Sequence, residues 1–311
     1  MSDNLRETRA PGHGALVYSG QEDFAAAAAD FLGAGRAARA EMFIAATDEN
    51  LAAFSSLIDG YGEHVKLTEL ARQGADPGRI FGQIRMFADR HPGRPVRCWQ
   101  DVGWPGRSED EIAEAFRYEA LFGRAFAGSA TMILCSYDLR AANDTASDVE
   151  LVHSSVLRGG SWRPCHHAGA TPHDAWTGPA LRSPPGDAVQ LTFREDQAYV
   201  RRFAVAWARG AGLAASRVAD LMIAAGELTA NTLVHTEGPG TFAIWVAEDQ
   251  LVFQVSDTGC IADPLAGTFR PAPTAPGSRR GLWLVHQIGD LVQTRTGQAG
   301  TTTRVHMHLR D

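Results

Sequence analysis

The first half of the chain alternates short, uninterrupted apolar runs with stretches in which apolar residues recur at helical spacing. The apolar runs each predict a strand and lie at 15–18, 42–46, 65–70, 96–99 and 131–135. Helices are predicted at 22–32, 48–58, 80–87, 108–126 and 146–157. Strands that are apolar on both faces and alternate with helices are typical of a parallel sheet covered on both sides. The first half therefore predicts an α/β domain.

The second half has a different order of elements. A strand at 189–193 is followed by two helices, of which the second ends near His235. Residues 241–247 and 251–256 alternate between apolar and polar positions around a short polar turn, which indicates a hairpin. Residues 261–280 are predicted to form a Pro-rich lid, and 282–288 a short helix. Two final strands are predicted to meet in a turn around 297–300. This order predicts one layer of helices on a mixed sheet.

A stretch without apolar period separates the two halves. Residues 159–186 are rich in Gly, Pro, Ser and His and end in Pro184-Pro185-Gly186, which is typical of an interdomain linker. We set the domain boundaries at 11–168 and 187–311, with the linker proper at 169–186.

Composition excludes several classes of function. The net charge of −7 over 311 residues offers no overall basic surface for nucleic acid. No apolar run is long enough to span a membrane, and the polar N-terminus is unlike a secretion signal, so we expect a cytoplasmic protein without a membrane partner. Cys98, Cys135, Cys165 and Cys260 form no C-x-x-C pair. The adjacent Cys165-His166-His167 does not by itself favour a metal site.

The candidate chemistry lies in the second domain. Glu227 and Asn231 are four residues apart on the long helix and therefore share one face. Such a pair taken alone is more often part of a solvated surface. Here it is followed in order by Asp257-Thr258-Gly259, by Gly281-Leu282-Trp283-Leu284-Val285 and by Gly300-Thr301-Thr302-Thr303.

This ordered set resembles the E-x-x-x-N, D-x-G, G-L-x-L-V and terminal Gly-Thr boxes of the GHKL (HATPase) ATPases, and in particular the anti-sigma factor serine kinases. The resemblance implies an α+β Bergerat-type sandwich that binds ATP and Mg²⁺. It implies that Asn231 holds Mg²⁺ and that Glu227 acts as general base on the attacking hydroxyl. Asp257 would accept the adenine amino hydrogen, and Gly259 would let the backbone approach the base.

The remaining boxes would complete the nucleotide site. Gly281 and Leu282 open a helix whose N-terminal N–H groups would cradle phosphate. Gly277 would be a hinge of the lid, and Arg280 would add positive charge near the γ-phosphate or a partner, unless it is a plain exposed residue. Thr302, or its neighbour Thr301, would share a water with Asp257. We interpret His235, which follows this region of the helix, as structural.

The first domain carries a second resemblance. His13, Tyr18, Tyr118-Glu119-Ala120-Leu121, the segment 134–138 and His153 are similar to the MEDS sensory domain, whose members are thought to recognise small, hydrocarbon-like signals. The resemblance implies a RecA-like parallel sheet with helices on both faces and a small hydrophobic signal as ligand. A crevice at the carboxyl ends of the strands is the expected binding place, with Tyr18, Trp99, Trp104 and Tyr137 either lining it or only packing in the core. The first strand-to-helix loop, Ser19-Gly20-Gln21-Glu22-Asp23, lacks a phosphate-binding pattern, so this sheet is not expected to be an ATPase.

Three functions stay open from the sequence. The first is a transcription regulator in which an ATP-dependent protein serine kinase phosphorylates an anti-sigma antagonist and thereby controls a sigma factor, gated by the sensory domain. The second is an ATP-binding module that sequesters its partner without turnover. The third, a histidine kinase, would need a phosphoacceptor-histidine helical hairpin, which His153-Ser154-Ser155 does not resemble. Dimerisation with a second copy is an expectation from the family alone.

Overall fold

The computed structural model describes residues 12–70, 76–141, 146–165, 180–270 and 280–310. The chain divides into two compact units, of which the first comprises 1–73 with 83–176 and the second 74–82 with 177–311. Each unit has its own sheet and its own core. None of the helices in the described part of the chain is long and apolar enough to cross a lipid bilayer.

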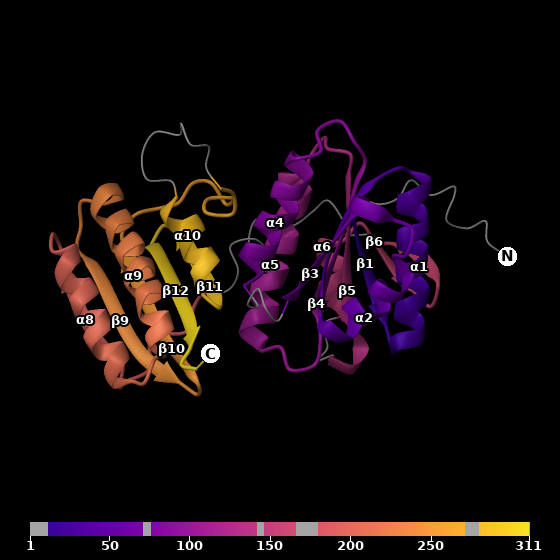
Figure 1. Cartoon of the computed structure of the whole chain (residues 1–311). Coiled ribbons are helices and arrows are strands. Elements are labelled where there is room, and N and C mark those ends of the chain that lie inside the picture. Colours follow the sequence, from indigo (N-terminus) through magenta and orange to yellow (C-terminus); the bar gives the residue numbers. More distant parts are fainter. Residues whose placement is uncertain (1–11, 71–75, 142–145, 166–179, 271–279, 311) are drawn as a thin grey trace. The chain divides into compact units, whose positions relative to one another are not determined.

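The first unit is built on a seven-stranded sheet with the order β3-β2-β4-β5-β1-β6-β7 (Figure 1). Its strands are β1 (His13–Tyr18), β2 (Glu41–Ala46), β3 (Val65–Glu69), β4 (Val96–Gly103), β5 (Thr131–Asp138), β6 (Ser155–Arg158) and β7 (Ser161–Pro164). All neighbouring strands pair in parallel except β6 and β7, which form an antiparallel hairpin at one edge. The prediction of a parallel α/β sheet is confirmed.

Helices cover both faces of this sheet (Figure 1). They are α1 (Gln21–Ala37), α2 (Asp48–Leu57), α4 (Pro77–Asp89), α5 (Glu109–Ala125) and α6 (Ala146–Val152). Of α4, residues 83–89 belong to this unit. The helix α5 begins with a capping box, in which Ser108 Oγ accepts from the Glu111 N–H and the Glu111 carboxylate accepts from the Ser108 N–H. Phe116 on α5 stacks on Tyr137 of β5, whereas α1 and α2 pack on the opposite face.

An aromatic cluster fills the core beneath α1 and α2. Trp99 is fully buried, and its ring meets Phe24 and Phe54 edge-on at centroid distances of 5.2 and 5.0 Å. Tyr18 and Tyr137 are also buried. Of the two roles left open for these aromatics, packing in the core is the one that the structure shows for Tyr18, Trp99 and Tyr137. Trp104 is half-buried, with the Arg107 guanidinium 4.3 Å from the centre of its ring.

The sheet edge formed by β6 and β7 differs from the sequence prediction. The predicted helix 146–157 ends at Val152, and Ser155–Arg158 is the strand β6 instead. Its partner β7 lies inside the stretch that was predicted to be linker. Gly159 and Gly160 have φ of 55° and 72° and form the tight turn between these strands, a conformation that favours glycine. Residues 166–179, which hold most of the predicted linker and the His166-His167 pair, lie outside the described residues.

The second unit is a five-stranded sheet with the order β11-β12-β10-β9-β8. The strands are β8 (Val189–Phe193), β9 (Gly240–Ala247), β10 (Gln250–Asp257), β11 (Leu291–Gly297) and β12 (Gly300–His308), and the helices are α8 (Gln197–Gly210), α9 (Ala215–His235) and α10 (Gly281–Ile288). Every strand pair in the described part of this sheet is antiparallel, so the mixed sheet predicted from the order of elements is wrong in this detail.

One face of this sheet carries the main core of the unit. Residues of α8, α9 and α10 bury their apolar sides against Phe242, Phe253 and Val305 of three different strands (Figure 1). On the other face Trp245 and Val252 form a smaller cluster. The predicted layer of helices on a sheet is confirmed. Of the predicted lid, residues 261–270 are described and form no helix or strand, whereas 271–279, with Gly277, lie outside the described residues.

The turn between β11 and β12 generates a stability prediction. Gly300 has φ of 119°, and a Cβ added there would lie 2.0 Å from the carbonyl oxygen of Asp257. Gly297, its partner across the turn, has nothing within 4 Å of an added Cβ. We expect Gly300→Ala to lower the free energy of unfolding by about 3 kcal/mol, because it adds backbone strain to a clash with the main chain.

The matched control is Gly297→Ala, which should leave the unfolding midpoint of the second unit nearly unchanged. Thermal unfolding, monitored by circular dichroism, measures the difference in unfolding midpoint between Gly300→Ala and Gly297→Ala. Equal midpoints for the two variants would show that the backbone at Gly300 does not require glycine.

Candidate nucleotide-binding site

The long helix α9 positions the first group of functional side chains. Leu221, Ala224, Ala225 and Leu228 are buried and fix one side of the helix against the sheet. Glu227 and Asn231 lie beside this buried stripe and are half-buried, so they remain accessible from the edge of the helix. The sequence prediction that both share one helix face therefore agrees with the position of α9 on the sheet.

The N-terminal end of α10 lies against this pair. A Cβ added at Gly281, the first residue of α10, would lie 2.6 Å from Glu227 Oε2 and 3.4 Å from Asn231 Oδ1. Only a glycine can occupy this position without displacing Glu227. The first N–H groups of a helix have no partner within the helix and carry partial positive charge, so they attract anions. The structure thus brings a carboxylate, a carboxamide oxygen and a helix N-terminus to one place.

Asp257, at the end of β10, is held by two protein donors. Its Oδ2 accepts a hydrogen bond from Thr232 Oγ1 at 2.7 Å, and its Oδ1 accepts from the Gly259 N–H at 2.8 Å. Thr232 is fully buried and follows Asn231 directly on α9. This hydrogen bond ties the end of β10 to the same helix that carries Glu227 and Asn231. Each carboxylate oxygen keeps a second lone pair, so the half-buried Asp257 can still accept from a ligand.

The glycine after Asp257 lies in a crowded turn. A Cβ added at Gly259 would be 2.7 Å from Thr236 Cγ2 and 3.0 Å from Asp257 Oδ1. A larger residue would push apart the turn and the end of α9. In the structure, contacts within the protein are what require glycine at this position. The approach of the Gly259 backbone to a base stays a prediction.

The register of β10 and β12 changes the part predicted for Thr302. Thr301 lies opposite Asp257, whereas Thr302 lies opposite Ser256 and donates to its Oγ at 3.0 Å. Directly opposed residues share one face of a sheet and successive residues alternate, so Thr302 and Asp257 face opposite sides. Thr301 donates to the Gly259 carbonyl at 2.8 Å. Of the two threonines considered, Thr301 is therefore the one beside Asp257.

Three further residues named from the sequence lie around the start of α10. Leu282 is half-buried, and a Cβ added at Gly267 would lie 2.5 Å from its Cγ, so the described part of the predicted lid packs on this side chain. Arg280 is the exposed N-cap residue of α10. Gly277 lies outside the described residues.

Sequence reasoning missed Thr232. It lies one residue after Asn231 and one turn after Leu228, so the helical period marks it only as a buried position. A threonine among apolar residues on the buried stripe of a helix needs a hydrogen-bond partner, and this was the available signal.

The residues present fit a magnesium nucleotide. A carboxamide and a carboxylate oxygen suit Mg²⁺, which prefers oxygen ligands and is completed by phosphate and water. The N-terminus of α10 suits phosphate. Asp257 suits a donor such as an exocyclic amino group, because each of its carboxylate oxygens keeps a lone pair beside its protein donor.

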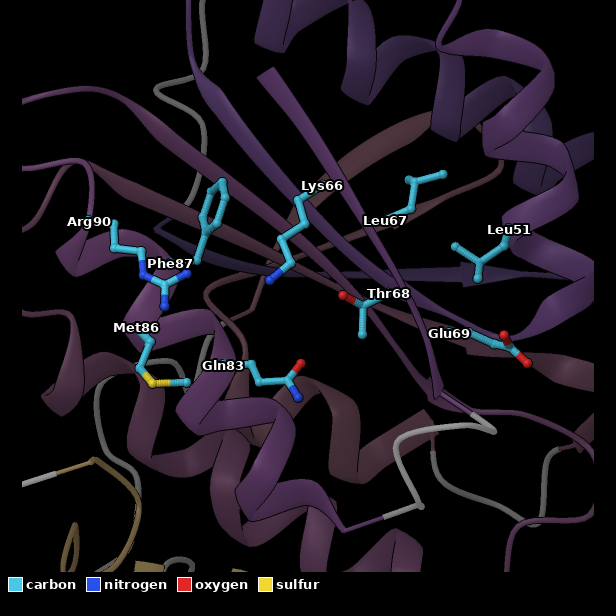
Figure 2. A pocket seen from close by; sticks show the side chains of 9 residues that line it. All are labelled: Leu51, Lys66, Leu67, Thr68, Glu69, Gln83, Met86, Phe87 and Arg90. Atoms are coloured by element: carbon cyan, nitrogen blue, oxygen red, sulfur yellow. The ribbon is translucent and has the colours of Figure 1, made fainter. Parts of the chain in front are cut away.

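The first unit has more than one pocket, and one of them lies beside β3. It has a volume of about 560 Å³ at the free edge of β3 (Figure 2). The lining residues are Leu51, Lys66, Leu67, Thr68, Glu69, Gln83, Met86, Phe87 and Arg90. Lys66, the single lysine of the chain, lies 5.7 Å from the centre of the Phe43 ring. This pocket is not the aromatic crevice that the sequence suggested, because the aromatic residues named for that crevice do not line it.

The hydrogen bond between Thr232 and Asp257 gives a second prediction. We expect Thr232→Val to lower the free energy of unfolding by about 1–2 kcal/mol, because it removes the donor of a charge-assisted bond. Thr229→Val is the control, since Thr229 is equally buried on α9 but donates only to the Ala225 and Gly226 carbonyls of its own helix.

Urea denaturation of both variants provides the comparison. A Thr232→Val variant as stable as Thr229→Val would mean that the hydrogen bond to Asp257 does not hold the end of β10 to α9.

Comparison with known proteins gives two separate family matches along the chain. Residues 12–154 match the family model of the MEDS domain, described as a methanogen/methylotroph, DcmR sensory domain. Residues 192–307 match the family model of the histidine kinase-like ATPase domain. No curated protein matches the chain.

Two solved structures are similar to parts of the chain. The RsbU and RsbW domains of Rv1364c from Mycobacterium tuberculosis are 19% identical over 40% of this chain and 33% of that one, with a TM-score of 0.31. The chain thus spans about a third of that protein's structure. The second structure, an ATPase domain, is 10% identical over 47% of this chain and 68% of that one, also with a TM-score of 0.31.

Proposed function

Because the chain joins a MEDS sensory domain to a histidine kinase-like ATPase domain, we propose that it is an ATP-dependent protein serine kinase of the anti-sigma type. One observation carries this proposal. Glu227 and Asn231 of α9 lie against Gly281, the first residue of α10. Thr232, also on α9, donates a hydrogen bond to Asp257. The residues proposed for metal binding and proton transfer, and the partner that holds Asp257, therefore all belong to α9.

In this proposal each residue has a distinct task. Asn231 ligates Mg²⁺ through Oδ1, and the N–H groups at the start of α10 hold the phosphates. Asp257 accepts a hydrogen bond from the adenine amino group. Glu227 accepts the proton of the serine hydroxyl on the protein substrate. Bound Mg²⁺-ATP supplies the phosphoryl group and the charge compensation for its transfer.

The MEDS domain supplies the regulation. We propose that it responds to a small molecule, for which the pocket beside β3 is a candidate binding place. The lining by Lys66, Glu69 and Arg90 adds polar groups to a pocket that also contains Leu51 and Phe87. The proposed protein partners are an anti-sigma antagonist as substrate and a sigma factor as the regulated target, in a cytoplasmic protein that pairs with a second copy of itself.

The test is phosphorylation of a protein substrate. The purified full chain, γ-labelled ATP and Mg²⁺ are added to an extract of the source organism, and acid-stable label is located by mass spectrometry. We expect phosphoserine on a small protein. Glu227→Gln should lower the rate of labelling by about 10²–10⁴-fold, because the general base is lost, while ATP still binds. Asn231→Ala should lose the Mg²⁺-dependent part of ATP binding.

The matched control is Glu237→Gln, which changes an exposed carboxylate just beyond the same helix. It should label the substrate at the wild-type rate. If the wild-type protein binds ATP but labels nothing, the kinase proposal fails, and an ATP-dependent binding module without turnover takes its place. Label that is lost in acid would instead point to phosphohistidine.

A further inference from the structure

Four ligand-type side chains converge in the interior of the MEDS domain, away from the pocket and in a unit separate from the nucleotide site. They are His13 at the start of β1, Glu119 on α5, Cys135 on β5 and His153 just after α6. Each offers a nitrogen, oxygen or sulfur atom, and these atoms all lie within 4.8 Å of one another. All four residues lie in the range that matches the MEDS family model.

The imidazole of His153 is oriented by the protein backbone. Its Nδ1 lies 2.8 Å from the Val149 carbonyl oxygen, so Nδ1 carries the proton and donates it there. The lone pair of Nε2 consequently points into the cluster. His153 is fully buried, and its Nε2 has no hydrogen-bond partner in the described part of the protein. A buried polar atom without a partner costs free energy and calls for an explanation.

His13 also has a backbone hydrogen-bond partner, but its Nε2 contacts a side chain of the cluster. It bonds to the backbone at Val152, and its Nε2 lies 3.3 Å from Cys135 Sγ. Burial, together with the neighbouring His153, lowers the pKa of His13 well below its usual value, and burial lowers the pKa of His153. Both rings are therefore neutral, which is the form that binds metal ions.

The other two side chains also present acceptor atoms to the same point. Glu119 Oε1 lies 3.7 Å from His153 Nε2, too far for a hydrogen bond even if the carboxyl were protonated. Tyr137 donates to the other oxygen of Glu119. The Gln100 side-chain amide donates to Cys135 Sγ at 3.3 Å. Partners of this kind, which orient the ligands from behind, are typical of metal sites.

We propose that His13, Glu119, Cys135 and His153 bind one divalent transition-metal ion, for which Zn²⁺ is the reference. Two imidazole nitrogens, a thiolate and a carboxylate form a set that suits four-coordinate Zn²⁺. The thiolate and the carboxylate together balance the charge of the ion, which matters at a fully buried place. On binding, the Cys135 S–H bond breaks, the sulfur bonds to the metal and one proton leaves to solvent for each ion bound.

This inference uses the MEDS domain alone and does not depend on the proposed kinase activity. The metal ion would be bound inside the sensory domain by ligands from β1, β5, α5 and the residue just after α6. A metal that joins these elements stabilises the folded domain by mass action.

The experiment is titration of the chelator-treated full chain with Co²⁺, a spectroscopic substitute for Zn²⁺. We expect a thiolate-to-cobalt charge-transfer band in the near ultraviolet that saturates at one equivalent and disappears when Zn²⁺ is added. The thermal midpoint of the protein should rise with either ion. Cys135→Ser should abolish the band.

Two variants make the result specific. Cys98→Ser, a change at an equally buried cysteine on β4, should keep the band. His153→Gln should weaken Zn²⁺ binding by about 100-fold or more, since it removes a ligand oriented by its backbone partner. The inference is overturned if the folded wild-type chain takes up less than one equivalent, or if the band persists in Cys135→Ser. The wild-type measurement decides the question even where a variant fails to fold.

Discussion

The candidate nucleotide site depends on the packing of α9 against the antiparallel sheet. Ala224 and Ala225 are small enough to let the helix approach the strands closely, and Leu221 and Leu228 fill the space beside Phe242 and Phe253. This contact fixes the rotation of α9 and hence the direction of every polar side chain on it. Thr232 therefore reaches Asp257, and Glu227 and Asn231 lie beneath the start of α10.

Much of this arrangement could be predicted from local pattern. Apolar residues of α9 recur at helical spacing, and the spacing of Glu227 and Asn231 places them on one face without knowledge of the fold. Gly281 was expected to open a helix and Gly259 to let the backbone approach a base, and the structure shows that neighbouring side chains crowd both positions. Such features depend on a few adjacent residues, so the sequence contains them.

Features that depend on strand register could not be predicted from local pattern, because they depend on how distant segments pair. Thr301 and Thr302 are adjacent and chemically identical, and a shift of one residue decides which of them faces Asp257. The short hairpin of β6 and β7 was missed because two four-residue strands joined by Gly159-Gly160 give little periodic signal. The antiparallel direction of the second sheet likewise depends on contacts between distant segments.

The polar cluster in the interior of the first unit was not predictable from the sequence for the same reason. His13, Glu119, Cys135 and His153 all belong to the motifs named from the sequence, but the sequence did not predict that they lie together. Their convergence requires the strand order β5-β1-β6, which places His13 and the end of α6 beside β5. At this buried place, His153 Nε2 has no hydrogen-bond partner among the described residues. The two domains thus each have a polar centre built on their own sheet.

The most direct test of the nucleotide site is a comparison of ATP and GTP binding to the purified full chain with Mg²⁺ by titration calorimetry. Asp257 is an acceptor, so it suits the amino group of adenine and opposes the carbonyl oxygen of guanine. The account predicts that ATP binds at least about 100-fold more tightly than GTP, and that Asp257→Asn narrows the difference. Equal affinities for the two nucleotides, or no binding of ATP, would contradict it.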